Sequence, residues 1–438
     1  MTETMRQGCY FSPEVKEEAK EKRDPLENFS EEKKTQIREA VLLRNYDKTK
    51  DILEKEALLP EIIQEVRGRY GERIGAIRDF QMPEEGWEMF AILWAYDEPT
   101  AEHCIRTAEG AVEILFERIE DPFGKEIVFA DLMKEEGVEA QEFLFACLLH
   151  DVGKVGIPQK ILNNRVTPSG WDERFCEIVE GGEGEEARRL VLRRVGLDPA
   201  KQYSKKGAQD RLKGMHLWAK EVIPTEYAFP KDERENIRNI LMNMGLDPNV
   251  SFLGLLDEHA KLSQEILSKY GHRIAAAVAG GHHNRNGTTS LYKFTLPSLH
   301  GGGRDREERK KFLEYSEAEA SNLLKIVDIT DACLDPTRPY KSQKSELWTL
   351  AEIVRMTEAR KEINLFLTYG WIKTRLRNLT QEKLNLNEGL NPLWLISVQG
   401  FLKRYEEQVR KQWGHSQAGG ELGEKQEEDS AELAPAMV

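Results

Sequence analysis

Apolar residues recur along most of the chain with the three- to four-residue spacing of amphipathic helices, whereas stretches that alternate with the period of a β-strand are scarce. The pattern therefore predicts an all-α protein. Helical stretches are expected first at Glu31 to Lys55 and at Pro60 to Arg78. Ser30, directly before two glutamates, is typical of a helix start. From about Trp87 the predicted helices become more apolar and carry isolated histidines.

Changes in residue composition and apolar spacing along the chain predict four regions. Within the core region, 91–345, residues 180–250 form an insertion that is rich in Gly and Glu and broken by three prolines. We interpret this insertion as a surface excursion or a lid. A loop rich in glycine, Thr295 to Arg306, is expected to be flexible or tightly turned. The regions are 1–90, charged and helical; 91–345, the core; 346–413, helical; and 414–438, a disordered acidic tail with six acidic residues and one lysine.

Charge, apolar runs and cysteines exclude several classes of function. The net charge of −14 argues against broad electrostatic binding to nucleic acid. The longest apolar runs, such as Phe143 to Leu149, are far shorter than the ~20 residues that cross a bilayer. The N-terminus lacks a secretion signal pattern. Five scattered cysteines predict reduced cytoplasmic thiols used as small apolar side chains, and they disfavour a zinc–thiolate site.

The pair His150-Asp151 is the first candidate for chemistry. It closes an apolar helix and precedes Val-Gly-Lys-Val-Gly-Ile-Pro. Taken alone, a His-Asp pair is more often a chance dipeptide than a metal site. Here Lys154 adds a cation at the same helix end, and Gly153 and Gly156 are expected to let the backbone turn closely past a metal or phosphate.

Further candidates lie beyond the insertion. His282-His283 follow an alanine-rich helix, where two adjacent imidazoles are costly to desolvate unless they bind something; the alternative is a pair of exposed loop histidines. His259 is predicted to open an amphipathic helix from Ala260 to Tyr270. Asp328 lies within an apolar helix, and Asp331 shares its face as an outward residue, a supporting partner or a cap.

Histidine and carboxylate ligands without thiolate favour iron, manganese, zinc, cobalt or magnesium over copper or an iron–sulfur cluster. Two such ions roughly 3.5–4 Å apart can hold a bridging hydroxide and clamp the phosphoryl oxygens during in-line attack. A nearby lysine then neutralises charge on the equatorial oxygens, and Lys154 is the natural candidate.

The order of these motifs resembles that of HD-GYP domains. His103 on a helix comes first, followed by His150-Asp151-Val-Gly-Lys-Val-Gly-Ile-Pro158, His259, His282-His283 before Asn286-Gly287, and Asp328-Ile-Thr-Asp-Ala332 before Arg338-Pro-Tyr-Lys341. HD-GYP domains are a branch of the HD superfamily of metal-dependent phosphohydrolases, and their best-known members hydrolyse cyclic di-GMP. The resemblance covers about Thr100 to Lys344 apart from the insertion.

The resemblance implies an HD-domain helical bundle with extra N- and C-terminal helices. It implies a bridging role for Asp151, contact of Lys154 with the scissile phosphate, and a place for Arg338 and Lys341 at the substrate end of the pocket. His216, His272, His300 and His415 have no counterpart and are interpreted as structural or surface residues. The implied metal ligands are His103, His150, Asp151, His259, His282, His283 and Asp328.

Two departures from the family pattern shape the expected function. Thr288 and Thr289 follow Gly287 where the family has Tyr-Pro, so the motif is degenerate. Pro99 stands where three-metal members carry Glu, with Glu98 and Glu102 out of register, so we expect two divalent ions, iron or manganese first.

The function that follows is hydrolysis of a phosphoester in a nucleotide or cyclic (di)nucleotide through a metal-bridged hydroxide. One alternative is a cyclic di-GMP phosphodiesterase proper. Another is a catalytically silent metal-binding protein that contacts protein partners through its N- or C-terminal helices.

Overall fold

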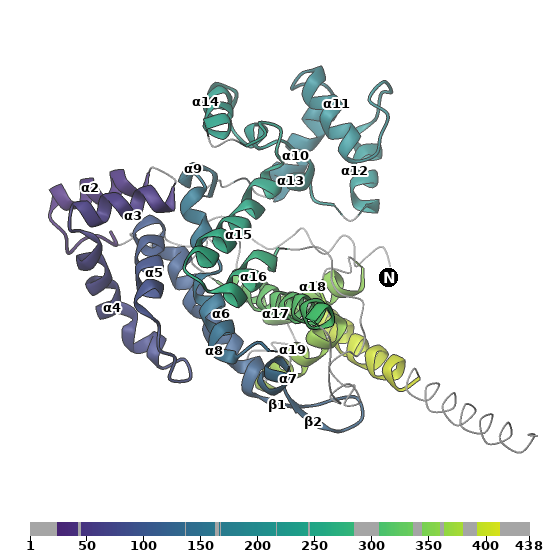
Figure 1. Cartoon of the computed structure of the whole chain (residues 1–438). Helices are drawn as coiled ribbons and strands as arrows, with labels where there is room; N and C mark the ends of the chain where they lie inside the picture. The colour runs from purple at the N-terminus through teal and green to yellow at the C-terminus, as the bar shows by residue number, and fades with distance from the viewer. Residues whose placement is uncertain are drawn as a thin grey trace, which may run out of the picture. The chain divides into compact units, whose positions relative to one another are not determined.

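The computed structural model describes residues 24–42, 45–135, 137–162, 166, 168–215, 217–243, 246–283, 306–335, 344–359, 363–379 and 392–411. Helices dominate these residues (Figure 1), as the apolar spacing predicts. The strands in the described part of the chain are β1 (Arg118–Glu120) and β2 (Glu126–Val128), an antiparallel pair with Ile119 opposite Ile127. The prediction of an all-α protein is confirmed.

The chain forms two compact units. The first contains Met1–Ala111, Gln141–His283 and Val327–Gln343, and the second contains Val112–Ala140, Asn284–Ile326 and Lys344–Val438. All the predicted metal ligands and Lys154 belong to the first unit. The bounds of the four regions expected from the sequence composition stay a prediction. Residues 295–305 of the predicted loop and the acidic tail at 414–438 lie outside the described residues.

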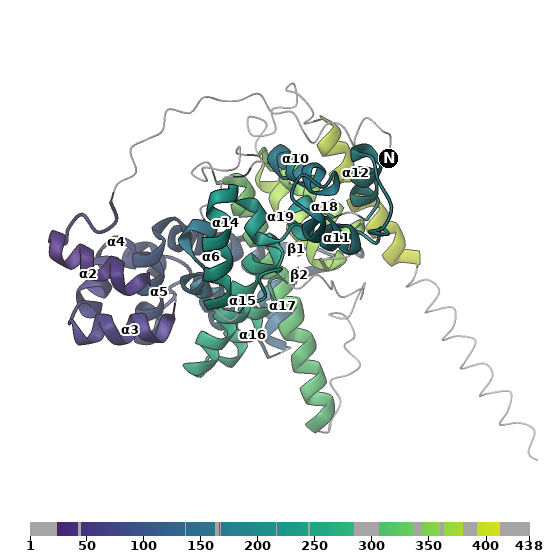
Figure 2. The same ribbon diagram turned by 90° about the horizontal axis from the view of Figure 1, so that it is seen from above.

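Four helices near the N-terminus, α2 (Glu31–Val41), α3 (Tyr46–Lys55), α4 (Leu59–Gly75) and α5 (Glu84–Tyr96), lie side by side (Figure 1, Figure 2). Ser30 caps the first of them, because its side chain accepts a hydrogen bond from the Lys33 backbone amide. The helical stretch predicted from Glu31 to Lys55 is divided between two helices. Asn45 starts a new helix by accepting from the Lys48 amide, so two helices share that stretch.

Five helices and a short 3₁₀ turn position the candidate site: α6 (Glu98–Phe116), α8 (Ala140–Leu149), η1 (Val152–Gly156), α15 (Phe252–Lys269), α16 (Arg273–Gly281) and α17 (Arg306–Leu334). Every residue of α8 from Phe143 onward is buried, and the helix ends directly before His150, as predicted. The prediction that His259 opens a helix is wrong. Ser251 caps α15 by accepting from the Gly254 amide, which places His259 in the helix interior.

Gly153 and Gly156 allow close helix packing, and that they also let the backbone turn past a metal or phosphate stays a prediction. A Cβ at Gly153 would lie 2.1 Å from the His259 carbonyl oxygen and 2.5 Å from the Ser263 backbone nitrogen. A Cβ at Gly156 would lie 2.6 Å from a methyl of Leu262. The missing side chains let η1 lie directly against α15, where the Gly153 amide donates to the Ser263 hydroxyl at 2.8 Å.

The insertion folds around a hydrophobic core that it shares with the segments on both sides of it. Its elements are α11 (Glu185–Arg194), α12 (Lys205–Gly214), α13 (Ala219–Val222), η2 (Thr225–Ala228) and α14 (Lys231–Asn243), and α10 (Pro168–Val179), directly before it, contributes to the same core. The same core includes Ile157 and Ile161, which follow η1 and lie in or near α9 (Gln159–Leu162), and Phe252 and Leu255 at the start of α15. A bridge between Pro224 and Ser251 joins the insertion to that helix. The insertion therefore supports the helix that carries His259.

The second unit is built from α7 (Phe129–Glu135), α18 (Glu346–Glu358), α19 (Leu365–Asn378), a helix over 392–411 and the small sheet. Gly370 lets Phe129 lie against α19, because an added Cβ would be 2.4 Å from that ring. The Arg375 guanidinium is mostly buried and pairs with Glu113 and Glu346.

Within the described part of the chain, no helix combines the length and apolarity that crossing a membrane requires. No disulfide joins the four described cysteines, Cys104, Cys147, Cys176 and Cys333, as predicted.

Candidate metal centre

The predicted ligands come together from distant parts of the sequence. His103 lies on α6, His150-Asp151 at the end of α8, His259 in α15, His282-His283 at the end of α16, and Asp328 on α17. Among the described residues, two of the groups with metal-ligand spacing are His103, His150 and Asp328, and His259, His282 and His283. Within each group the ligand atoms lie within 4.8 Å of one another.

Asp151 lies between these two groups. Its Oδ1 is 2.8 Å from His259 Nε2 in one group, and its Oδ2 is 3.5 Å from His150 Nε2 in the other. A carboxylate can offer each of its oxygens to a different partner. Its position is therefore the one that a bridging ligand between two ions would need.

Three of the histidines are oriented by the same kind of hydrogen bond. The Nδ1 atoms of His150, His259 and His282 each donate to the backbone carbonyl three residues earlier, at Cys147, Leu256 and Ala279. A carbonyl only accepts hydrogen bonds, so Nδ1 must carry the proton in these pairs. Nε2 of each ring then keeps its lone pair, which is the form of imidazole that binds a metal.

The three Nε2 atoms fit a bound cation. All are buried, and none is paired with a hydrogen-bond donor, since the Asp151 oxygen 2.8 Å from His259 Nε2 is itself an acceptor. A buried polar atom without a partner costs roughly 1–3 kcal/mol, so three in one cluster call for a ligand that satisfies them. Divalent ions prefer nitrogen and oxygen donors of this kind. The residues present therefore fit one or more divalent metal ions.

The chain matches no family model, no curated protein and no solved structure. The properties of the centre accordingly rest on its own geometry.

The charges of the cluster are balanced for metal binding. Burial alone would raise the pKa of Asp151, but the Lys154 ammonium and the neighbouring imidazoles hold that pKa well below its usual range. Burial likewise opposes ionisation of Asp328, whereas its hydrogen bond with His103 lowers the pKa strongly. Burial and the neighbouring histidines lower the pKa of His282 to about 3. The carboxylates are thus ionised and His282 is neutral at pH 7, as ligands must be.

A carboxylate and an arginine fix the remaining orientation of His103. Its Nδ1 lies 2.6 Å from Asp331 Oδ2, whereas its Nε2 lies 2.8 Å from Asp328 Oδ1. Arg106 donates to both oxygens of Asp331 and also to Asp335. Of the three roles that the sequence left open for Asp331, the structure supports that of a partner that orients a ligand. On α15, Asp257 lies 3.3 Å from His283 Nδ1.

Lys154 lies against the cluster from η1 and pairs with Asp151 Oδ2. Its side chain keeps 18% of its exposure, whereas that of Asp151 keeps 2%. The ammonium therefore stands where the buried cluster meets accessible space.

Other predicted residues are placed as follows. Glu98 and Glu102 each lie 3.3 Å from the Tyr70 hydroxyl, and neither joins a group with metal-ligand spacing in the described part of the chain. His272 precedes α16 and lies 3.3 Å from Glu85. Arg338, Lys341, His216, His300 and His415 lie outside the described residues.

Sequence reasoning did not single out Arg106, Asp257 or Cys104. Spacing could have signalled Arg106, which is three residues after His103 on the same helix face.

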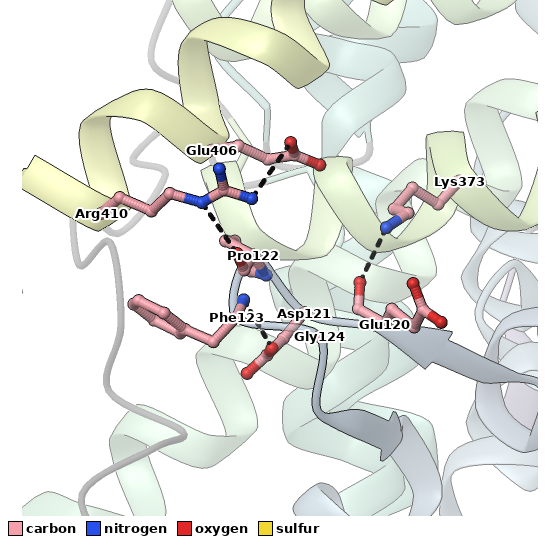
Figure 3. Close-up of a pocket in the computed structure, with 8 residues that line it drawn as sticks. All are labelled: Glu120, Asp121, Pro122, Phe123, Gly124, Lys373, Glu406 and Arg410. Carbon is pink, nitrogen blue, oxygen red and sulfur yellow. Dashed lines mark hydrogen bonds and ion pairs between the residues drawn. The ribbon is translucent and has the colours of Figure 1, made fainter.

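The second unit has a shallow pocket between the β1–β2 turn and the last helices (Figure 3). Both positively charged side chains of this pocket donate hydrogen bonds to backbone carbonyls. Lys373 donates to the Glu120 carbonyl at 2.9 Å, and Arg410 donates to the Pro122 carbonyl at 3.0 Å. These bonds tie the turn to the helices, and none of the predicted site residues lines the pocket.

Proposed function

We propose that the protein is a metal-dependent phosphohydrolase of the HD superfamily, with an HD-GYP-like core, which cleaves a phosphoester of a nucleotide or cyclic (di)nucleotide. The observation that carries the proposal is the convergence of two ligand groups on Asp151, with three buried Nε2 atoms that have no hydrogen-bond partner. The order of the sequence motifs supports the same function.

His103, His150 and Asp328 would hold one ion, and His259, His282 and His283 a second, with Asp151 shared between them. When bound, such ions supply positive charge to the phosphoryl oxygens and a water molecule of lowered pKa. The carbonyl bonds to Nδ1 keep the rings in the ligating tautomer, so these imidazoles need no rearrangement.

Lys154 would serve the substrate. Its ammonium neutralises Asp151 in the absence of an anion, and the partly exposed side chain can turn toward a phosphate at the edge of the cluster. A cation beside the phosphoryl group stabilises the charge that develops on its oxygens as the ester bond breaks.

Purified protein is loaded with Mn²⁺ or Fe²⁺, its metal content is measured by elemental analysis, and turnover of bis(p-nitrophenyl) phosphate and of a panel of nucleotides and cyclic dinucleotides is followed. The wild type is expected to turn over at least one substrate, and the double variant His150→Ala/Asp151→Ala to lose both metal and activity. Release of linear dinucleotide or GMP from cyclic di-GMP would assign that substrate.

Lys154→Met is the matched variant for the role of the lysine, since it keeps the length of the side chain without its charge. It is expected to retain metal and to lose turnover. Equal turnover in the wild type and the double variant would refute the proposal.

A further inference from the structure

One thiol reaches the candidate centre. Cys104 follows His103 on α6, is fully buried, and its Sγ forms a third group with metal-ligand spacing together with His150 and Asp151. The three ligand atoms lie within 4.8 Å of one another. The other described cysteines, Cys147, Cys176 and Cys333, belong to no such group among the residues that the structure describes.

A second observation points to a ligand at the same place. His150 is completely buried, and its Nε2 has no hydrogen-bond partner, although Asp151 Oδ2 lies only 3.5 Å away. The imidazole therefore presents a lone pair next to a thiol and an ionised carboxylate. Nitrogen, oxygen and sulfur donors together are the ligands of zinc, cobalt and ferrous iron rather than of magnesium.

The spacing limit of this group is compatible with a filled site. In the proposed function His103 and Asp328 would hold the same ion, so Cys104 would make it five-coordinate. Bond lengths of about 2.0–2.3 Å then place neighbouring ligand atoms roughly 2.8–3.8 Å apart, and the 4.8 Å limit of this group requires an inward shift of at most about 2 Å. Rotation of a cysteine side chain about one bond can supply such a shift.

We propose that Cys104 is a thiolate ligand of the ion held by His150 and Asp151, which gives the centre a preference for softer divalent ions. On binding, a sulfur–metal bond forms as the S–H bond breaks, and the proton leaves to solvent. The inference rests on the metal centre of the proposed function. It also revises the expectation that all the cysteines act as small apolar side chains.

Cobalt tests the proposal directly. The full chain is stripped with a chelator and loaded with Co²⁺ to a stoichiometry measured by elemental analysis, and its spectrum is searched for a thiolate-to-cobalt charge-transfer band in the near ultraviolet. The band is expected in the wild type and absent in Cys104→Ser. The matched control is Cys147→Ser, which is equally buried and lies three residues before His150, and which should keep the band.

Metal competition gives a second readout. Cys104→Ser is expected to weaken Zn²⁺ binding by about tenfold or more and to change Mg²⁺ binding by less than about threefold, because sulfur favours the softer ion. If the serine variant does not fold, X-ray absorption at the cobalt edge of the wild type decides the matter, since a Co–S bond of about 2.3 Å is then expected.

Cobalt bound without the band, or a band that persists in Cys104→Ser, overturns the inference. A protein that hydrolyses phosphoesters but shows no band keeps the proposed function and loses the thiolate ligand. A protein that shows the band but hydrolyses no phosphoester keeps the thiolate ligand and loses the proposed function. Failure to bind cobalt at all overturns the centre itself.

Discussion

Substitution of Gly153 by alanine tests whether close packing of η1 on α15 builds the metal centre. The new Cβ would lie 2.1 Å from the His259 carbonyl oxygen and 2.5 Å from the Ser263 nitrogen. Both opposing atoms are backbone, so α15 would have to retreat by about 1 Å to restore ordinary contact, and overpacking of this kind costs ~3 kcal/mol. The same movement would widen the 2.8 Å separation between His259 Nε2 and Asp151 Oδ1.

The expected result is a Tm lower by roughly 6–12 °C in thermal unfolding, together with loss of stoichiometric Mn²⁺ binding. Two alanine variants serve as controls. At Gly156 the added Cβ would meet only a methyl of Leu262, which can move, so a smaller loss is expected. At Gly68, in α4, it would meet nothing within 4 Å, so helix propensity predicts a gain of about 1 kcal/mol. A Gly153 variant that matches the Gly156 variant in both stability and metal content would show that the packing argument is wrong.

Three further predictions concern the orientation of His103, the protonation of His282 and the ion pairs of Arg375. Asp331→Ala should weaken Mn²⁺ binding about 10- to 100-fold in equilibrium dialysis, because His103 loses the carboxylate that orients it; unchanged affinity would contradict this. The metal-free protein should lose stability as the pH falls from about 7 toward 3, by up to about 1.4 kcal/mol per pH unit for each proton, because the unfolded chain protonates near pH 6.5 whereas the pKa of His282 in the fold is about 3. Urea unfolding in the presence of chelator measures this, and stability that is constant or rises on acidification is the contrary outcome. Arg375→Met should destabilise the second unit by about 1–3 kcal/mol in the same assay, because the mostly buried Glu346 is left without its partner whereas Glu113, 41% exposed, can be solvated; no measurable loss would mean that the pair contributes little.

Sequence patterns predicted the helical class, because helix formation depends largely on local signals. The apolar run before His150 determined where α8 ends, and the capping residue Ser30 determined where α2 begins. His282-His283 could be placed after a helix for the same reason. Order along the chain then grouped ligands that no local signal connects.

Sequence patterns were less informative where tertiary contacts decide. His259 directly follows Asp257 and Glu258, and periodicity alone did not reveal that Ser251, eight residues earlier, starts its helix. Gly153 was interpreted as a turn for a ligand, and only the packed structure shows the backbone of α15 against it. The orienting pair Asp331–Arg106 joins residues 225 positions apart, a contact that cannot be inferred from one sequence.

The hydrophobic core that the insertion shares with its flanking segments limits how the protein can be shortened, both by engineering and in evolution. A segment that can be excised or exchanged must leave both flanks covered, but here Ile157 and Leu255 are buried by the segment itself. Truncation at residues 180–250 would expose those flanks to water and release the ends of two ligand-bearing stretches at once. Shorter versions of this protein would need compensating substitutions at both flanks before they could lose the segment.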